Sequence, residues 1–182
     1  MRIIGGNKKG KRILVARKGI RPTKGIVREA VLQVIQNRIP GAHVLDIFAG
    51  SGALGLEALS RGAQRCVFIE QRPTILYRNI ENIVPEMNTE VIRNDYISAL
   101  KRLAHNKFSV IFMDPPYGKT YVDRTVSLID KHGIMEDNGI MVIEHHPEEL
   151  FALPDGFSIV KQRRYGDTMI TYVTMRGKNE QY

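Results

Sequence analysis

The sequence Asp-Pro-Pro-Tyr at residues 114–117 directly follows an apolar run at residues 108–113. A short apolar run of this kind predicts a buried strand of a parallel sheet. Two consecutive prolines have no backbone N–H to donate, so the strand has to end there with its carbonyl oxygens available. A carboxylate, two rigid carbonyl acceptors and an aromatic ring then lie at the carboxyl end of one strand, where open α/β sheets bind ligands. This set suits the presentation of a planar amine to an electrophile, and the candidate catalytic residues are Asp114, Pro115, Pro116 and Tyr117.

A glycine-rich loop follows another apolar strand and opens a helix. Residues 46–55 read Asp-Ile-Phe-Ala-Gly-Ser-Gly-Ala-Leu-Gly, and their three glycines match the spacing of the dinucleotide-binding fingerprint. That match is weak alone, because a tight strand-to-helix turn without a ligand has the same composition. The acids at the ends of successive predicted strands strengthen it, because stability alone hardly explains so many carboxylates on one rim. These acids are Asp46, Glu70, Asp95 and Asp114.

Two cofactors are compatible with this loop. A nicotinamide dinucleotide would place its pyrophosphate at the helix N-terminus, where the negative charge of Asp46 is unfavourable. The same charge suits a cationic sulfonium cofactor, and Glu70 is placed to accept hydrogen bonds from two ribose hydroxyls. The Asp-Pro-Pro-Tyr motif also has no role in hydride transfer. We therefore expect S-adenosylmethionine, with S-adenosylhomocysteine as product, bound by Asp46, Phe48, Ala49, Gly50, Ser51, Gly52, Gly55, Glu70, Asp95 and Tyr96.

Strands and helices alternate from residue 43 onward, which is typical of βαβ units and a mostly parallel sheet. The spacing predicts strands at 44–48, 65–70, 90–94, 108–113 and 139–145, and helices near 24–38, 54–61, 74–84, 97–105 and 122–131. Two final strands, 157–164 and 169–175, are joined by Tyr165-Gly166-Asp167-Thr168 as an antiparallel hairpin. The fold class is therefore α/β, a Rossmann-like seven-stranded sheet with helices on both faces.

The net charge of +8 is concentrated at the N-terminus. Residues 1–28 contain ten basic residues and no acid, whereas the rest of the chain has a net charge of −2. Apolar pairs around a glycine- and lysine-rich turn predict a small β-hairpin, so we divide the chain into a basic extension, 1–22, and a catalytic domain, 23–182. An ordered basic surface favours a nucleic-acid partner. The candidate RNA-binding residues are Lys8, Lys9, Lys11, Arg12, Arg21, Lys24 and Arg28.

The composition excludes several other classes. With 43% hydrophobic and 25% charged residues the chain is of the soluble globular type, and it has neither a membrane-length apolar run nor a signal-peptide core. Cys66 is the one cysteine, which excludes an internal disulfide and a cysteine metal cluster. His145-His146 has no further ligand at metal-site spacing. We expect a cytoplasmic protein without a metal.

These motifs together resemble the class I methyltransferases, and most closely the bacterial enzymes that methylate the exocyclic N2 of a guanine in 16S ribosomal RNA. The resemblance covers nearly the whole chain. One departure is Lys24-Gly25, where that family usually has Thr-Asp. The matching segments are residues 1–6, 9–12, 21–23, 27–29, 46–63, 114–117 and 165–168.

The resemblance implies methyl transfer from S-adenosylmethionine to a guanine N2 of 16S ribosomal RNA. It implies that Asp114 and the Pro115 carbonyl accept the amine hydrogens and that Tyr117 stacks on the base. The small size and the basic arm favour a monomer that acts on a 30S subunit or an assembly intermediate. Three alternatives are a DNA methyltransferase acting on adenine N6 or cytosine N4, a non-catalytic RNA-binding assembly factor and a nicotinamide-binding protein. A DNA methyltransferase commonly needs a target-recognition domain, and no stretch here is long enough to form one.

Overall fold

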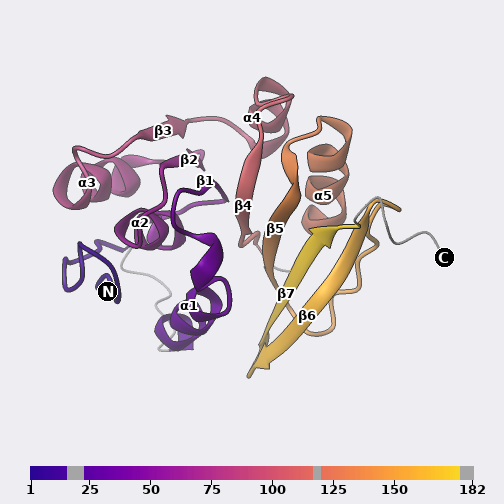
Figure 1. The fold of residues 1–182 in the computed structure, drawn as a ribbon, viewed down its shortest axis with the longest axis horizontal. Helices are drawn as coiled ribbons and strands as arrows, with labels where there is room; N and C mark the ends of the chain where they lie inside the picture. Colours follow the sequence, from indigo (N-terminus) through magenta and orange to yellow (C-terminus); the bar gives the residue numbers. More distant parts are fainter. Residues whose placement is uncertain (16–22, 117–119, 177–182) are drawn as a thin grey trace.

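The alternation of strands and helices predicted from the sequence is present in the structure, a computed structural model that describes residues 1–15, 23–116 and 120–176 (Figure 1). The helices are α1 (Thr23–Val34), α2 (Ala53–Ser60), α3 (Thr74–Ile83), α4 (Tyr96–Arg102) and α5 (Tyr121–Lys131), with a 3-10 turn η1 (Gln36–Arg38) after α1. The strands are β1 (His43–Ile47), β2 (Arg65–Ile69), β3 (Thr89–Ile92), β4 (Phe108–Met113), β5 (Met135–His145), β6 (Phe157–Tyr165) and β7 (Thr168–Met175).

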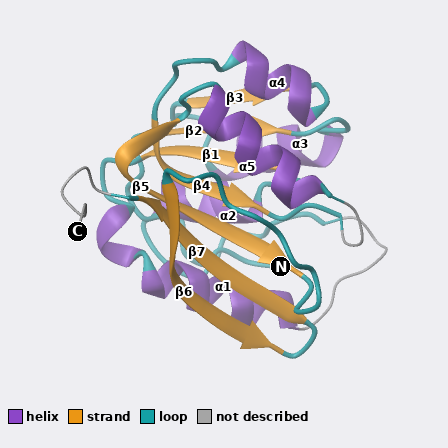
Figure 2. Ribbon diagram, turned by 90° about the vertical axis from the view of Figure 1, so that its right-hand side faces the viewer, coloured by secondary structure: helices purple, strands orange, loops and turns teal. Residues whose placement is uncertain are grey.

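The seven strands form one sheet in the order β3-β2-β1-β4-β5-β7-β6, which Figure 2 shows from β3 at one edge to β6 at the other. The first five strands in this order are parallel. β7 runs antiparallel between β5 and β6, so the C-terminal hairpin extends the sheet at one edge. The mostly parallel seven-stranded sheet and its C-terminal hairpin are confirmed.

Two apolar cores lie on the two faces of the sheet. Successive side chains of a strand point to opposite faces, so Val44 packs with α1, α2 and α3, whereas its neighbour Leu45 packs with α4 and α5. The same alternation places Asp46 on the face that carries α1. Figure 1 shows α1, α2 and α3 on one side of the sheet and α4 and α5 on the other.

The first 15 residues fold against this body. Ile3 and Ile13 are buried in the same core as α1 and α2. The predicted hairpin is present, but it is held by one antiparallel bridge between Arg2 and Arg12 and does not form two full strands. Beyond the hairpin, the backbone N–H of Leu14 donates to the Asn79 side chain of α3.

Several element boundaries differ from the prediction. The helix expected over 24–38 ends at Val34, and a 3-10 turn completes the segment. The strand expected over 90–94 is Thr89–Ile92, because Asn94 and Asp95 already form the cap of α4. In the part of the chain that the structure describes, no helix has the length and apolar character needed to cross a membrane.

Candidate active site

Two adjoining cavities open at the carboxyl ends of the parallel strands. The larger has a volume of about 820 Å³ and the smaller about 180 Å³. Of the residues predicted to form the site, the larger cavity is bordered by Phe48, Glu70, Asp95, Tyr96, Asp114, Pro115 and Pro116. The smaller is bordered by Asp46, Phe48, Ala49, Gly50, Ser51 and Asp114. Two strand-end motifs far apart in the sequence therefore meet here, and Asp114 borders both cavities.

Of the glycines in the loop after β1, Gly50 borders the smaller cavity, whereas Gly52 and Gly55 border neither cavity. Gly50 and Gly52 have φ angles of +56° and +77°, in the left-handed region that side chains rarely adopt. Gly55 allows a close approach of α2 to β2, because a Cβ atom there would lie 2.4 Å from the ring of Phe68. The loop is thus a tight strand-to-helix turn in which larger residues at Gly50 and Gly52 would be strained.

Glu70 holds the glycine loop from the end of the neighbouring strand. One carboxylate oxygen accepts a hydrogen bond from Gly50 N at 2.8 Å, and the other accepts one from Arg72 N at 2.9 Å. Each carboxylate oxygen can accept more than one hydrogen bond, so Glu70 retains acceptor capacity at the border of the larger cavity. A role of Glu70 in ribose binding stays a prediction.

Asp46 lies at the inner end of the smaller cavity and is 4% exposed. Its carboxylate accepts a hydrogen bond from Gly55 N at 3.0 Å. Burial first, and then the negative charges of Asp114 and Glu70, raise the pKa of Asp46 to about 7 against the opposing effect of the hydrogen bond from Gly55. A positive ligand group nearby would favour the ionised form of Asp46.

Three aromatic rings form one wall of the larger cavity. Phe48, Tyr96 and Tyr121 have ring centroids 5.1 to 5.8 Å apart. Phe48 adopts a φ of +62°, a strained conformation for a bulky residue that is typically kept at a functional site. The wall is suited to a flat ring such as a purine.

Asp95 has a structural role beside this wall. Its carboxylate caps α4 by accepting hydrogen bonds from Ile97 N and Ser98 N, both at 3.0 Å. The bond from Ser98, followed by the other hydrogen bonds, lowers the pKa of Asp95. Asp95 also borders the larger cavity, so the cap fixes its carboxylate at the site.

Some residues that border the larger cavity were not among the predicted site residues. Tyr121 begins α5, Glu144 lies near the end of β5, and residues 165–168 form the turn between β6 and β7. Glu144 could have been found as one more acid near a strand end, and the turn lies within a segment matched to the resembled family. Nothing local marks Tyr121. The predicted Tyr117 lies outside the described residues.

Arg28 does not fit its predicted role in RNA binding. It is 5% exposed, and its guanidinium donates a hydrogen bond to Arg2 O at 2.6 Å and contacts the Met1 sulfur. Its Nε lies 3.8 Å from a carboxylate oxygen of Glu57. Burial lowers the pKa of Arg28, an effect that Glu57 opposes. Arg28 therefore borders the smaller cavity and contacts the N-terminal segment. It is too buried to bind phosphates at the surface.

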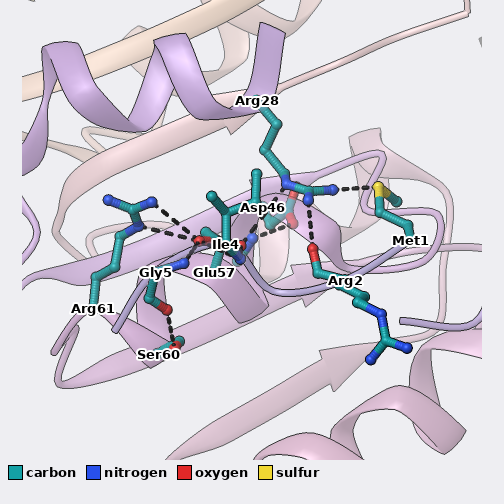
Figure 3. A network of polar contacts seen from close by, with 10 residues as sticks. Met1, Arg2, Ile4, Gly5, Arg28, Asp46, Glu57, Ser60 and Arg61 are labelled. Carbon is teal, nitrogen blue, oxygen red and sulfur yellow. Dashed lines mark hydrogen bonds and ion pairs between the residues drawn. The ribbon is translucent and has the colours of Figure 1, made fainter. Parts of the chain in front are cut away.

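Glu57 is the centre of this polar network, shown in Figure 3, and was not singled out from the sequence. Its fully buried carboxylate accepts hydrogen bonds from the backbone of Ile4 at 2.9 Å and of Gly5 at 2.7 Å. Arg61, the residue that follows α2, adds an ion pair at 3.1 Å. The network joins the N-terminal segment, α1 and α2.

Four of the other predicted RNA-binding residues lie in the N-terminal hairpin. Lys8 forms an ion pair with Glu86 in the loop before β3, and its backbone donates to Ser60, the last residue of α2. Because α2 begins at the glycine loop, eight helical residues, or about 12 Å, separate Lys8 from the cavities. Lys9, Lys11 and Arg12 are exposed in the same hairpin. Arg21 and the side chain of Lys24 lie outside the described residues.

This chain is similar in sequence to known proteins over most of its length. The model of the family described as conserved hypothetical protein 95 matches residues 1–174. The Bacillus subtilis protein YlbH is 35% identical over 97% of this chain and 100% of its own length. The Escherichia coli ribosomal RNA small subunit methyltransferase D is 34% identical over 91% of this chain and 85% of its own length.

Solved structures extend the likeness to three dimensions. The E. coli protein yhhF superposes with a TM-score of 0.86 at 30% identity, covering 98% of this chain and 99% of that one. The resemblance inferred from the motifs is confirmed. The chain belongs to the family described as conserved hypothetical protein 95, and it has the class I fold of the S-adenosylmethionine-dependent methyltransferases.

Proposed function

We propose that this protein is a ribosomal RNA methyltransferase that transfers a methyl group from S-adenosylmethionine to the exocyclic N2 of a guanine in 16S ribosomal RNA. The observation that supports this most directly is the position of Asp114. It follows β4, precedes two prolines and borders both cavities. A donor and a base that both enter this pair of adjoining cavities would therefore meet at its carboxylate. The similar protein from E. coli is named a ribosomal RNA small subunit methyltransferase.

The residues around the cavities fit S-adenosylmethionine. The rings of Phe48, Tyr96 and Tyr121 offer an apolar wall for adenine, and Glu70 has acceptor capacity for ribose hydroxyls. Asp46 supplies negative charge beside the smaller cavity, which suits a cation. A volume of about 820 Å³ falls in the range of cavities that enclose whole ligands. When bound, the cofactor supplies an electrophilic methyl carbon on a sulfonium.

Asp114 and the residues next to it would prepare the nucleophile. The guanine amine is a weak nucleophile because its lone pair is conjugated with the ring. A hydrogen bond from the amine to Asp114, and a second to the carbonyl of Pro115, would favour a more tetrahedral nitrogen whose lone pair points at the methyl group. Orientation of the two reactants can account for about 7–11 kcal/mol of the barrier. A base stacked in a helix cannot enter, so the nucleotide has to be unpaired or flipped out.

The remaining parts of the proposal concern the substrate particle. We propose a cytoplasmic monomer that acts on a 30S subunit or an assembly intermediate. A small enzyme with a positive surplus can obtain its specificity from a large ribonucleoprotein surface.

The test is methyl transfer from labelled S-adenosylmethionine to three substrates: 30S particles with unmethylated 16S RNA, the same RNA free of protein, and duplex DNA. The expected result is one labelled guanine N2 in 16S RNA, mapped by nuclease digestion and mass spectrometry. Label in DNA alone would replace the proposal with a DNA methyltransferase. No label in any substrate, combined with binding of RNA, would favour an assembly factor.

A further inference from the structure

The outer strand β6 carries positive charge close to the mouth of the larger cavity. The turn after β6, with Tyr165 and Thr168 on either side, forms part of the cavity wall. β6 is the last strand of the sheet, so one of its edges has no partner strand among the described residues. It contains Lys161, Arg163 and Arg164 and no acid.

The register of the hairpin places part of this charge on the face that carries α1. Arg163 pairs with Ile170, which pairs in turn with Glu144, so the three side chains form a row across the sheet. Glu144 and Ile170 both border the smaller cavity. Lys161 lies two residues before Arg163, and residues two apart on a strand lie on the same face about 7 Å from each other. Tyr165, Arg163 and Lys161 therefore form one strip that leads away from the site.

The two cations of this strip are available for a ligand. Arg163 is exposed and Lys161 is partly exposed. Neither forms an ion pair with an acid of the described ranges 1–15, 23–116 and 120–176, whereas Lys8 in the N-terminal hairpin is paired with Glu86. Arg164 points to the opposite face, and its Nε donates to Gly166 O at 2.9 Å, which supports the turn. Positive charge without an ion-pair partner in these ranges therefore begins at Arg163, two residues before Tyr165 in the cavity wall.

We propose that the strip of Tyr165, Arg163 and Lys161 binds backbone phosphates of the RNA strand that adjoins the target nucleotide. This inference rests on the proposed function and adds the path of the substrate to it. A flipped nucleotide stays attached to its strand, so the flanking phosphates have to leave the mouth over some part of the surface. The α1 face of β6 combines closeness to the mouth with unpaired cations, and phosphates are the ligands that such cations bind.

The experiment uses the full chain and the variants Arg163→Gln, Lys161→Gln and the double variant. Lys101→Gln on α4 removes the same charge on the opposite face, and Arg163→Lys retains the charge. Affinity for 30S particles with unmethylated 16S RNA is measured over a range of salt concentrations, together with KM and kcat for methyl transfer. Affinity for S-adenosylhomocysteine, measured by calorimetry, reports on the cofactor site.

We expect each glutamine in the strip to lower the salt slope of log affinity by about 0.7, the value for one phosphate contact with a single strand. The double variant should raise KM about tenfold or more, with kcat and S-adenosylhomocysteine affinity unchanged. Arg163→Lys should behave nearly as wild type, and Lys101→Gln should have no effect.

Identical salt slopes in the wild type and the double variant would show that the strip does not bind phosphates, whatever the result for methyl transfer. A loss of affinity that Arg163→Lys does not restore would also overturn it, because the effect would then not depend on charge. If the wild-type protein binds the particles through Lys161 and Arg163 but methylates none of them, phosphate binding by the strip would stand. The proposed methyltransferase function would be wrong.

Discussion

Two groups of carboxylates lie on the α1 side of the sheet, and their surroundings differ. Glu57 is fully buried and accepts hydrogen bonds from two backbone amides and from Arg61 (Figure 3). Asp46 and Asp114 border cavities, and Asp46 accepts a backbone hydrogen bond from Gly55. A carboxylate whose partners all come from the protein stabilises a fold, whereas one that faces a cavity remains able to act on a ligand. Residue type alone does not separate these roles.

The largest effect on activity is expected at Asp114. Asp114→Asn should lower kcat by a factor of about 10² to 10⁴, the range typical for a positioned acid–base group, while the midpoint of thermal unfolding changes little. Labelled methyl transfer and calorimetry of the same preparations check both parts. Asp130→Asn, an exposed acid on α5, is the matched control. Wild-type turnover in Asp114→Asn would remove this residue from the mechanism.

The largest effect on stability is expected at Glu57. Glu57→Ala should lower the free energy of unfolding by about 3–5 kcal/mol, because it leaves Arg28 buried without its charged partner. Urea denaturation measures this loss. Glu57→Gln retains the side-chain shape and should lose less, which keeps the comparison informative if the alanine variant does not fold. A Glu57→Ala protein as stable as wild type would contradict a structural role.

Asp46 predicts a pH dependence of cofactor affinity. Its pKa of about 7 in the ligand-free fold means that protonation competes with a cationic ligand. As the pH is raised toward 7, affinity for S-adenosylmethionine should therefore increase by up to about tenfold per pH unit. Above pH 7 the affinity should become constant. S-adenosylhomocysteine lacks the positive sulfur, so its affinity should rise less. Calorimetric titrations from pH 5 to 8 test this, and equal pH profiles for both ligands would rule out the charge interaction.

The same shift has the opposite sign for the stability of the ligand-free protein. Folding penalises the ionised carboxylate, so the Asp46 contribution favours the folded state below the unfolded pKa of about 3.9 and is lost as pH rises toward 7. Asp46→Asn should remove this slope. Chemical denaturation of both proteins between pH 4 and 8 measures it.

The smallest effect is expected at Arg61, the more exposed partner of Glu57. Its ion pair follows the i,i+4 spacing on α2, with 22% of the arginine side chain exposed. Arg61→Gln should cost about 0.3–0.5 kcal/mol of unfolding free energy. A loss as large as that of Glu57→Ala would mean that Arg61, rather than the backbone amides and Arg28, holds the network together.

The sequence predicted the features that depend on local order. Strand alternation, the glycine turn and the proline-terminated strand β4 all depend on residues within a few positions of one another. It did not predict the partners of Glu57, because Ile4 and Gly5 lie more than 50 positions away in the sequence. It also misplaced Arg28, since its burial follows from the packing of α1 against the N-terminal segment. Charge density in the sequence likewise does not reveal that Lys8 lies at the far end of α2.

Phe48 carries a consequence for engineering. Its left-handed backbone would suit glycine, and such conformations cost about 1–3 kcal/mol. Phe48→Gly would relieve this strain, but the ring that packs against Tyr96 and Tyr121 would be lost with it. Any programme of thermostabilisation should therefore hold this position fixed or monitor donor binding at every round.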